Sequence, residues 1–215
     1  MLILAGLGNP GPKYEHNRHN VGFMAVDALA RRWSFPAFRS KFQGHSAEGT
    51  IDGERILLLK PQTYMNDSGR SIGEALKFYK GQSADVVVFY DELDLAPGRF
   101  RMKTGGGAAG HNGVRSTIAH IGPDFRRARM GIGHPGHKDR VLGHVLSDFH
   151  KVDLDWLKAL NEAVADAAPF LVKGEDERYQ AEVMRLAPAE KADPRGPRSR
   201  AGRHRSGERP RRCRC

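Results

Sequence analysis

The stretch DVVVFYDE, residues 85–92, constrains the fold of this chain more than any other. Between its acidic ends it consists only of β-branched and aromatic residues, without alternation of apolar and polar positions. Such a run predicts a central strand that is buried on both faces, as in parallel sheets covered by helices. The strand carries Asp91 at its carboxyl end, which is where open α/β sheets bind their ligands.

Other strands and helices are expected to alternate around this strand. We predict strands at residues 1–7, an apolar run, at 98–104, where apolar and polar residues alternate, and at 126–133. The Asp52-Gly53 pair predicts a type I′ hairpin between residues 45–51 and 55–61. The spacing of apolar residues predicts a helix that begins after Asn20, a candidate N-cap, and four further helices later in the chain. We therefore expect a single α/β domain over residues 1–187, with a mixed, mostly parallel sheet flanked by helices. The residues that carry the helical pattern are Val21, Met24, Ala25, Ala28 and Leu29; Ile72, Ala75, Leu76 and Tyr79, before Gly81; residues 113–122; Leu157, Leu160, Val164, Ala168 and Leu171, before Gly174; and residues 175–186.

The last residues differ in composition from the rest of the chain. Residues 188–215 are rich in Arg, Pro, Gly and Ser with almost nothing to bury, so we expect a disordered basic tail. Residues 191–215 hold ten Lys and Arg against two acids, a net charge of +8 out of +10 for the whole chain, which leaves +2 for residues 1–190. This pattern favours a solvated tail over an auxiliary RNA-binding arm. Any RNA surface on the nearly neutral remainder must be a local basic patch.

The sequence holds no targeting, disulfide or metal-binding signal. No apolar run approaches the length of a membrane span, and the N-terminal residues lack the basic flank and long apolar region of a signal peptide. The only cysteines, Cys213 and Cys215, lie among arginines in a spacing typical of neither a disulfide framework nor a zinc site. We expect a cytoplasmic protein without a membrane partner, a metal or a cofactor.

The loop GLGNPG, residues 6–11, matches the pattern G-x-G-x-x-G directly after a predicted strand. A dinucleotide-binding loop must open a helix that holds the pyrophosphate, and an acid must end the next strand about 20 residues further on. Here Pro10 and Pro12 disfavour a helix in register with the loop, and Asp27 falls within the predicted helix. The segment MKTGGGAAG, residues 102–110, is not a Walker A loop, because its lysine precedes the glycines. Both segments therefore argue against a nucleotide cofactor.

A stiff Pro-Gly-Pro loop would instead hold polar side chains at the end of the first strand. The candidates are Asn9 and a histidine, either His16 or His19, and His19 directly precedes the predicted helix cap. The positive end of a helix dipole disfavours an imidazolium, so we expect His19 to be neutral near pH 7, the form that a general base requires. Taken alone, a loop histidine is more often an ordinary surface residue.

Further polar residues follow other predicted elements. Asp91 ends the buried strand, and an ionised carboxylate there needs a partner, for which a histidine N–H is suited. Asn66 and Asn112 each lie in a turn before a helix, where an asparagine alone is more often a cap or turn residue. Three amides, one histidine and one acid at strand ends, without a second nucleophile or a metal-ligand set, predict a hydrolase that activates water.

Four longer blocks follow one another along the chain. They are GLGNPGPKYEHNRHNVGF (6–23), KPQTYMNDSG (60–69), DELDLAPGRFRMKTGGGAAGHNG (91–113) and RRARMGIGHP (126–135). In this order they resemble the bacterial peptidyl-tRNA hydrolase family, over about residues 1–187. The resemblance implies a monomeric α/β domain with a mixed sheet. It also implies cofactor-free hydrolysis of the ester that joins a peptide to the ribose of a tRNA, which recycles tRNA after abortive translation.

The resemblance further implies roles for individual residues. His19 resembles the base that takes a proton from the attacking water, and Asp91 resembles the acid that orients this base. Lys103 and Arg129 resemble a basic pair that grips a tRNA phosphate. The resemblance also implies a substrate-binding set, namely Asn9, Tyr14, Tyr64, Asn66 and Asn112. We expect Arg101 and Arg127 to extend the basic pair.

Two other classes of function stay open. A noncatalytic RNA-binding protein on the same fold would tolerate loss of His19 but not of Lys103 and Arg129. A nucleotide-dependent oxidoreductase would show cofactor absorbance and is disfavoured by the two loop prolines. The basic tail has no counterpart in the family pattern, and if it bound RNA it would add nonspecific, salt-sensitive affinity.

Overall fold

The computed structural model describes residues 1–189, so nearly all of the predicted tail, residues 188–215, lies outside the described residues. The strands form one seven-stranded sheet in the order β2-β3-β4-β1-β5-β7-β6. The central strands β4, β1, β5 and β7 are parallel, whereas β2 and β3 at one edge and β6 at the other pair antiparallel. The strands are β1 (Leu2–Gly6), β2 (Arg39–Lys41), β3 (Gly44–Ile51), β4 (Glu54–Pro61), β5 (Val86–Glu92), β6 (Phe100–Thr104) and β7 (Arg126–Gly131).

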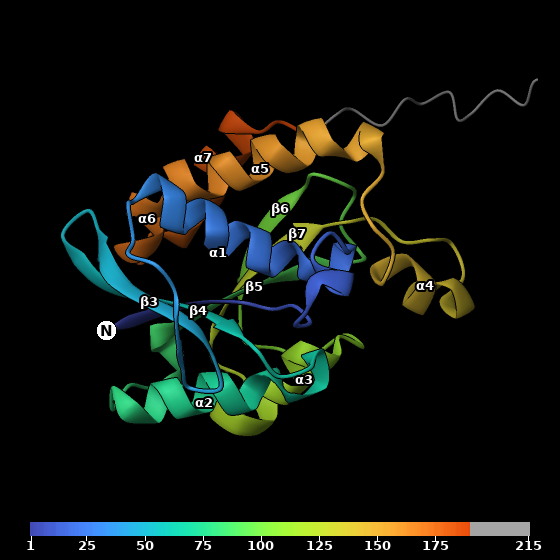
Figure 1. Ribbon diagram of the computed structural model, residues 1–215. Coiled ribbons are helices and arrows are strands. Elements are labelled where there is room, and N and C mark those ends of the chain that lie inside the picture. Colours follow the sequence, from blue (N-terminus) through green and yellow to red (C-terminus); the bar gives the residue numbers. More distant parts are fainter. Residues whose placement is uncertain (190–215) are drawn as a thin grey trace, which may run out of the picture.

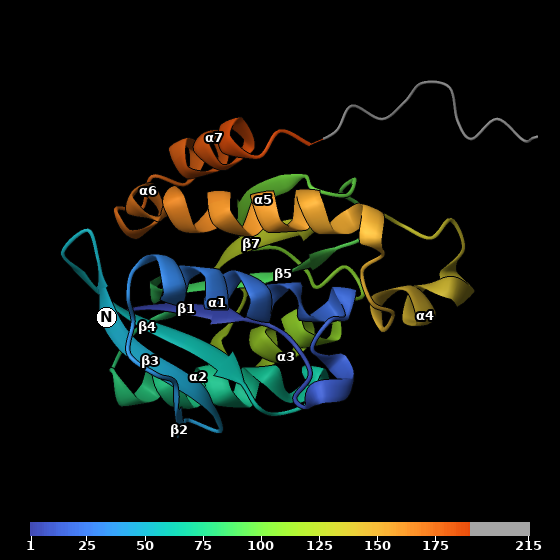
Figure 2. The same cartoon turned by 45° about the horizontal axis from the view of Figure 1, so that its top comes forward.

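Helices cover both faces of this sheet, which confirms the predicted single α/β domain with a mixed sheet (Figures 1 and 2). One face packs against α1, α5, α6 and α7, and the other packs against α2 and α3. The helices are α1 (Val21–Arg32), α2 (Ser68–Phe78), α3 (Asn112–Ile121), α4 (Val141–Val145), α5 (Leu154–Asp166), α6 (Ala168–Val172) and α7 (Asp176–Leu186).

The predicted central strand β5 is buried along its whole length. Val87 and Phe89 belong to the core under α1 and α5, while Val88 and Tyr90 belong to the core over α2 and α3. Side chains that alternate along a strand point to opposite faces, so a strand covered on both faces needs apolar residues at every position. This explains why the run contains no polar residue before Asp91.

Two local predictions depend on backbone conformation and are confirmed. Asp52 and Gly53 have φ angles of 49° and 84°, and two successive positive φ angles are the requirement of a type I′ hairpin turn. The helix after the first loop begins at Val21, with Asn20 at the N-cap position. Two short 3₁₀ turns, Pro12–Tyr14 and Arg18–Asn20, separate the glycine loop from α1, so the loop does not open the helix as a dinucleotide-binding loop would.

The glycines of the first loop allow the loop to press against α1. A Cβ atom on Gly6 would lie 2.1 Å from the carbonyl oxygen of Gly22, and one on Gly8 would lie 2.8 Å from the ring of Phe23. Such distances leave no room for any side chain. The close approach brings the 3₁₀ turn Arg18–Asn20 to the carboxyl end of the central strands.

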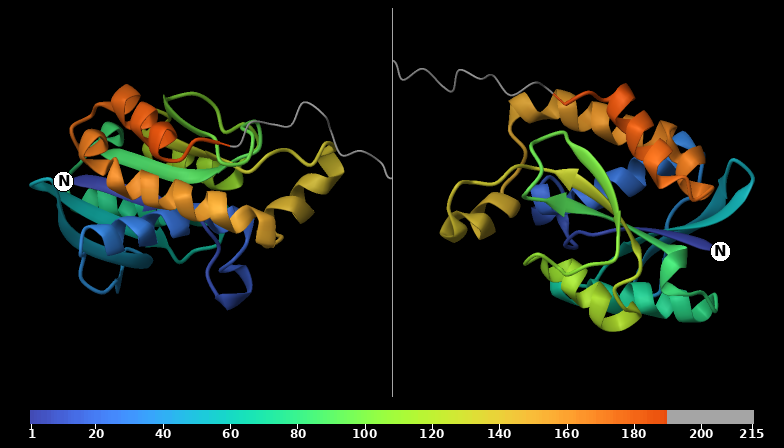
Figure 3. Two further views of the ribbon diagram at one scale, coloured as in Figure 1. Left: turned by 90° about the horizontal axis from the view of Figure 1, so that it is seen from above. Right: turned by 180° about the vertical axis from the view of Figure 1, so that it is seen from behind.

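The connecting loops gather at this end of the sheet, opposite the N-terminus. The short helix α4 projects from the body at the same end (Figure 3). No helix within residues 1–189 is long and apolar enough to cross a membrane. The loops at the carboxyl end of the parallel strands carry most of the side chains singled out from the sequence.

Candidate active site

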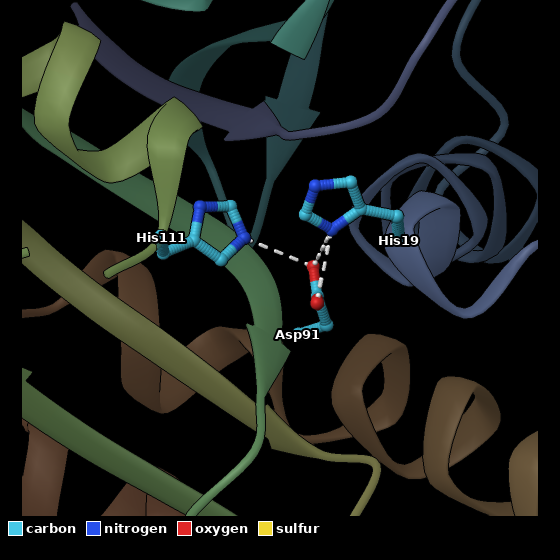
Figure 4. Close-up of side chains that lie close together, drawn as sticks. All are labelled: His19, Asp91 and His111. Carbon is cyan, nitrogen blue, oxygen red and sulfur yellow. Dashed lines mark hydrogen bonds and ion pairs between the residues drawn. The ribbon is translucent and has the colours of Figure 1, made fainter. Parts of the chain in front are cut away.

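Three elements bring His19, Asp91 and His111 together at the carboxyl end of the parallel strands (Figure 4). His19 lies in the 3₁₀ turn Arg18–Asn20, Asp91 is the second-last residue of β5, and His111 is the N-cap of α3. Nδ1 of His19 lies 2.8 Å and 3.0 Å from the two carboxylate oxygens of Asp91. Nε2 of His111 lies 3.0 Å from Oδ1 of the same carboxylate. The two imidazole rings therefore flank one buried acid, with their centroids 5.0 Å apart.

Asp91 is ionised in this arrangement. Burial alone raises the pKa of its carboxyl group, but the charges and hydrogen bonds of His19 and His111 outweigh burial and hold this pKa well below its usual range. An ionised carboxylate only accepts hydrogen bonds, so both ring nitrogens that face it must donate. The carboxylate is 2% exposed, which leaves the two histidines as its partners among residues 1–189.

The hydrogen bonds define the protonation of both rings. Nδ1 of His111 accepts the backbone N–H of Val114 at 3.3 Å, so this nitrogen carries no proton and Nε2 carries the one donated to Asp91. His111 is thus a neutral donor. Nδ1 of His19 donates to Asp91, so in the neutral ring the proton lies on Nδ1, and Nε2 is the unprotonated nitrogen, which points away from the carboxylate (Figure 4). This nitrogen is free to accept a proton.

The pKa of His19 is shifted in the direction opposite to the sequence-based expectation. Burial lowers this pKa, but the charge of Asp91 and the hydrogen bond to it outweigh burial, and the pKa is raised above its ordinary value. We had expected the dipole of α1 to disfavour the imidazolium. The carboxylate in direct contact has the larger effect because its full charge lies at hydrogen-bond distance. His19 is therefore a stronger base than a free histidine.

His111 was missed by sequence reasoning, which singled out its neighbour Asn112. The sequence did contain an indication of a second donor to Asp91, because a buried carboxylate has about four lone-pair positions and a single histidine N–H fills only one of them. A second donor was therefore to be expected near Asp91. His111, between a glycine-rich segment and the start of α3, was a candidate for this donor.

The same three residues are the group within residues 1–189 whose ligand atoms lie close enough together for a metal ion, within 4.8 Å of one another. A neutral histidine that binds a metal through Nε2 must carry its proton on Nδ1. Nδ1 of His111 instead accepts the N–H of Val114, so a metal at Nε2 would break this helix cap. The donor set thus fits a hydrogen-bonded network better than a metal site.

Asn9 lies in the loop after β1 and is nearly buried, at 8% exposed. Its side-chain oxygen accepts the backbone N–H of Met65 at 2.8 Å, so its amide NH₂ group remains available as a donor. Asn20 holds this loop, because its side chain bonds both the N–H and the carbonyl of Asn9 at 2.9 Å. Asn20 therefore occupies the N-cap position of α1 without capping the helix through its side chain.

The other predicted substrate-binding residues lie on the surface. Asn66 is exposed in the 3₁₀ turn Met65–Asp67, next to the residue that bonds Asn9. Asn112 is exposed at the start of α3 and accepts a hydrogen bond from Arg115 at 2.8 Å. Tyr64 is 62% exposed and Tyr14 is half-buried, and neither hydroxyl bonds any of the described residues. The structure thus joins Asn9 to the Asn66 turn but links neither tyrosine to Asp91.

The predicted phosphate-binding residues lie on the neighbouring strands β6 and β7. Arg101 pairs with Arg129 and Lys103 with Arg127 in the strand register, which puts all four on the face opposite Ala128 and Met130. Lys103 is exposed, and Nε of Arg129 donates to Glu92 at 2.9 Å, while the terminal nitrogens of Arg129 have no hydrogen-bond partner within residues 1–189. Arg127 does not extend the patch as expected, because it is 1% exposed and bonds backbone carbonyls.

Comparison with known proteins agrees with this fold and shows the family. The family model described as peptidyl-tRNA hydrolase matches residues 3–192. The peptidyl-tRNA hydrolase of Phenylobacterium zucineum is 70% identical over 199 residues, which cover 91% of this chain and 95% of that relative. That of Caulobacter vibrioides is 65% identical over 201 residues, covering 92% and 98%. The crystal structure of peptidyl-tRNA hydrolase from Acinetobacter baumannii matches with a TM-score of 0.81 at 41% identity and covers 85% of this chain and 94% of that one. The chain belongs to the peptidyl-tRNA hydrolase family.

Proposed function

We propose that this hydrolase cleaves the ester bond between the peptide and the 3′ ribose of peptidyl-tRNA, with His19 as general base and Asp91 as the acid that orients it. The observation that carries the proposal is the pair of hydrogen bonds from His19 Nδ1 to the buried Asp91 carboxylate, because they hold the proton of the neutral ring on Nδ1 and leave Nε2 as the nitrogen that accepts a proton. A neutral imidazole with an oriented free nitrogen is the group that a water-activating esterase requires.

The reaction proceeds in two steps at this nitrogen. Nε2 of His19 takes a proton from water while the water oxygen bonds to the ester carbonyl carbon, and the resulting imidazolium is stabilised by Asp91. The tetrahedral oxyanion then collapses, the bond to the ribose oxygen breaks, and this oxygen receives the proton from Nε2. The products are a free peptide acid and a tRNA with its 3′ hydroxyl. No metal and no covalent enzyme intermediate takes part.

Amide donors are proposed to supply the remaining stabilisation. The NH₂ group of Asn9, whose oxygen is already held by Met65, is suited to donate to the oxyanion. The amides of Asn66 and Asn112 are exposed and would bind the main chain of the peptide, with Tyr14 and Tyr64 beside the substrate. A single oxyanion donor contributes about 3–4 kcal/mol and a positioned base roughly 10²–10⁴-fold in rate, which is sufficient for an activated ester. A site that bonds a peptide amide discriminates against aminoacyl-tRNA, which lacks this group.

Single-turnover cleavage of an N-acetylated aminoacyl-tRNA tests the proposal. We expect the full chain to release the acylated amino acid with and without EDTA, and to leave the unacetylated aminoacyl-tRNA largely intact. A loss of cleavage in EDTA that is restored by a transition metal would instead assign His19, Asp91 and His111 to a metal site. Binding of tRNA without any cleavage would support a noncatalytic RNA-binding protein.

Lys103 and Arg129 are proposed to contact a tRNA phosphate. We expect Lys103→Ala to raise KM for the tRNA substrate with little change in kcat, and to lower the slope of log KM against log salt by about 1, as for the loss of one phosphate contact. Lys77→Ala is the matched control, because Lys77 is an exposed lysine at the far end of α2. An unchanged salt slope in Lys103→Ala, or an equal change in both variants, would contradict the contact.

The remaining proposals concern the whole chain. We propose that the catalytic domain spans residues 1–187, that residues 188–215 form a separate basic tail, and that the protein acts as a monomer in the cytoplasm. The match of the family model over residues 3–192 supports the first of these.

A further inference from the structure

Arg127 is the largest of the fully buried side chains by volume, yet it pairs with no carboxylate among residues 1–189. Its guanidinium instead bonds backbone carbonyls. Nη1 donates to the carbonyl of Gly107 and Nη2 to that of Gly106, each at 2.6 Å, and Nη2 also donates to the carbonyl of Pro123 at 3.3 Å. The group stacks on Phe125 at 4.5 Å. A buried cation without an acid is costly, so a role beyond packing is to be sought.

The carbonyls that Arg127 binds belong to the segment 105–110, GGGAAG, which connects β6 to α3. Gly105, Gly106, Ala109 and Gly110 all have positive φ angles, between 47° and 91°. Glycine-rich chain of this kind has many accessible conformations, so its own sequence does not define its path. One backbone bond ties the segment to another element, from Gly105 N–H to Phe125 at 3.4 Å, and a turn bond from His111 N–H to Ala108 at 2.9 Å closes its end. The fork of Arg127 is a further attachment, in the middle of the segment.

The segment links two parts of the proposed site. At its start, the ammonium of Lys103 lies beside Gly106, since a Cβ there would be 2.9 Å from Nζ. At its end, His111 donates to Asp91 and contacts the ring of Tyr90 edge-on, with centroids 5.1 Å apart. The position of Gly106 and Gly107 therefore affects both the proposed phosphate contact and the donor to the catalytic acid.

We propose that Arg127 is a positioning residue that anchors the segment 105–110, so that His111 reaches Asp91 and Lys103 faces the tRNA. This inference rests on the site proposed above. Arg127 itself does not touch the substrate, because its guanidinium is buried and its terminal nitrogens are occupied by carbonyls. A planar fork suits two adjacent carbonyls, whereas a lysine ammonium at the same place reaches them as a single point.

The test compares Arg127→Lys with Arg126→Lys in the full chain. Arg126 is the adjacent residue on β7 and undergoes the same chemical change, but it pairs with Asp176 and does not contact the segment. We expect Arg127→Lys to lower kcat about 10–100-fold, the cost of a displacement of about an ångström. We expect Arg126→Lys to keep wild-type kcat. Arg127→Met, which keeps an apolar stem of similar shape, should lower kcat at least as much.

The decisive readout is the ring N–H of His111, observed by ¹⁵N-edited NMR and assigned with His111→Ala. We expect this signal to be lost in Arg127→Lys, while the ring N–H of His19 remains. A lowered melting temperature with unchanged kcat and an unchanged His111 signal would overturn the proposal in favour of a purely structural role. A lower salt slope for tRNA binding with an intact His111 signal would overturn it in favour of direct phosphate binding.

If the wild type does not cleave, the proposed function fails, but the NMR comparison still decides the role of Arg127. Should Arg127→Met not fold, Arg127→Lys carries the test.

Discussion

Replacement of His19 by alanine is expected to lower the single-turnover rate of ester cleavage roughly 10²–10⁴-fold, the contribution of a positioned general base. The expectation follows from the hydrogen bonds of the ring. Nδ1 is committed to Asp91, and Nε2 is the nitrogen that can take a proton from water. The affinity for tRNA should change little, because the proposed phosphate contacts lie on β6 and β7. Cleavage is measured with N-acetylated aminoacyl-tRNA, and binding is measured with the uncharged tRNA.

His16→Ala is the matched control for this experiment. His16 lies three residues before His19 and is exposed, and its side chain bonds none of the described residues. We expect His16→Ala to cleave at the wild-type rate. Equal losses in the two variants, or wild-type cleavage by His19→Ala, would remove His19 from the role of base. Loss of tRNA binding in His19→Ala would show that this side chain binds substrate instead.

Replacement of Asp91 by asparagine is expected to have a comparable effect, on the order of 10³-fold in rate, because the amide carries no charge to stabilise the imidazolium and its NH₂ group replaces one of the two oxygens that accept from Nδ1 of His19. Its NH₂ group would favour the wrong tautomer of His19. The variant should also change the pH dependence. In the wild type the pKa of His19 is raised above the ordinary histidine value of 6.5. As the pH falls through this raised pKa, the ring is protonated and activity is lost.

The sign of the pH shift follows from the causes of the raised pKa. Asp91→Asn removes the charge that raises the pKa of His19 and leaves the burial that lowers it. The acid limb of kcat/KM should therefore move to lower pH in the variant, although the plateau is lower. The profile is measured from about pH 5 to 9, the range in which histidines titrate. An acid limb that stays in place would mean that a group other than His19 controls it.

The contrast between His19 and Arg127 explains how far the sequence predicted the site. The Pro-Gly-Pro loop and the predicted start of the helix, both local features, narrowed the candidates to His16 and His19, and the family resemblance singled out His19. Arg127 was expected to extend the phosphate patch of Lys103 and Arg129, and the strand register does put it on the same face of the sheet. Alternation determines the face of a strand but not what covers it. The segment 105–110 folds back over Arg127 and turns it from a surface residue into a buried anchor.

Three elements form through interactions between neighbouring residues and could be predicted without the fold: the doubly buried strand β5, the type I′ turn at Asp52-Gly53 and the start of α1. The position of Asp91 at a strand end could be predicted in the same way. Which side chains meet there depends on the fold, since His19 and Asp91 are 72 residues apart and His111 is 20 residues beyond Asp91. Neighbouring residues determine the local backbone conformation and which positions along a strand or helix are buried. Contact across such separations depends on strand order and on the close approach of Gly6 and Gly22, which together bring the loop after β1 beside the end of β5. The same contacts set the direction of the pKa shift of His19, because a carboxylate at hydrogen-bond distance outweighs a helix dipole.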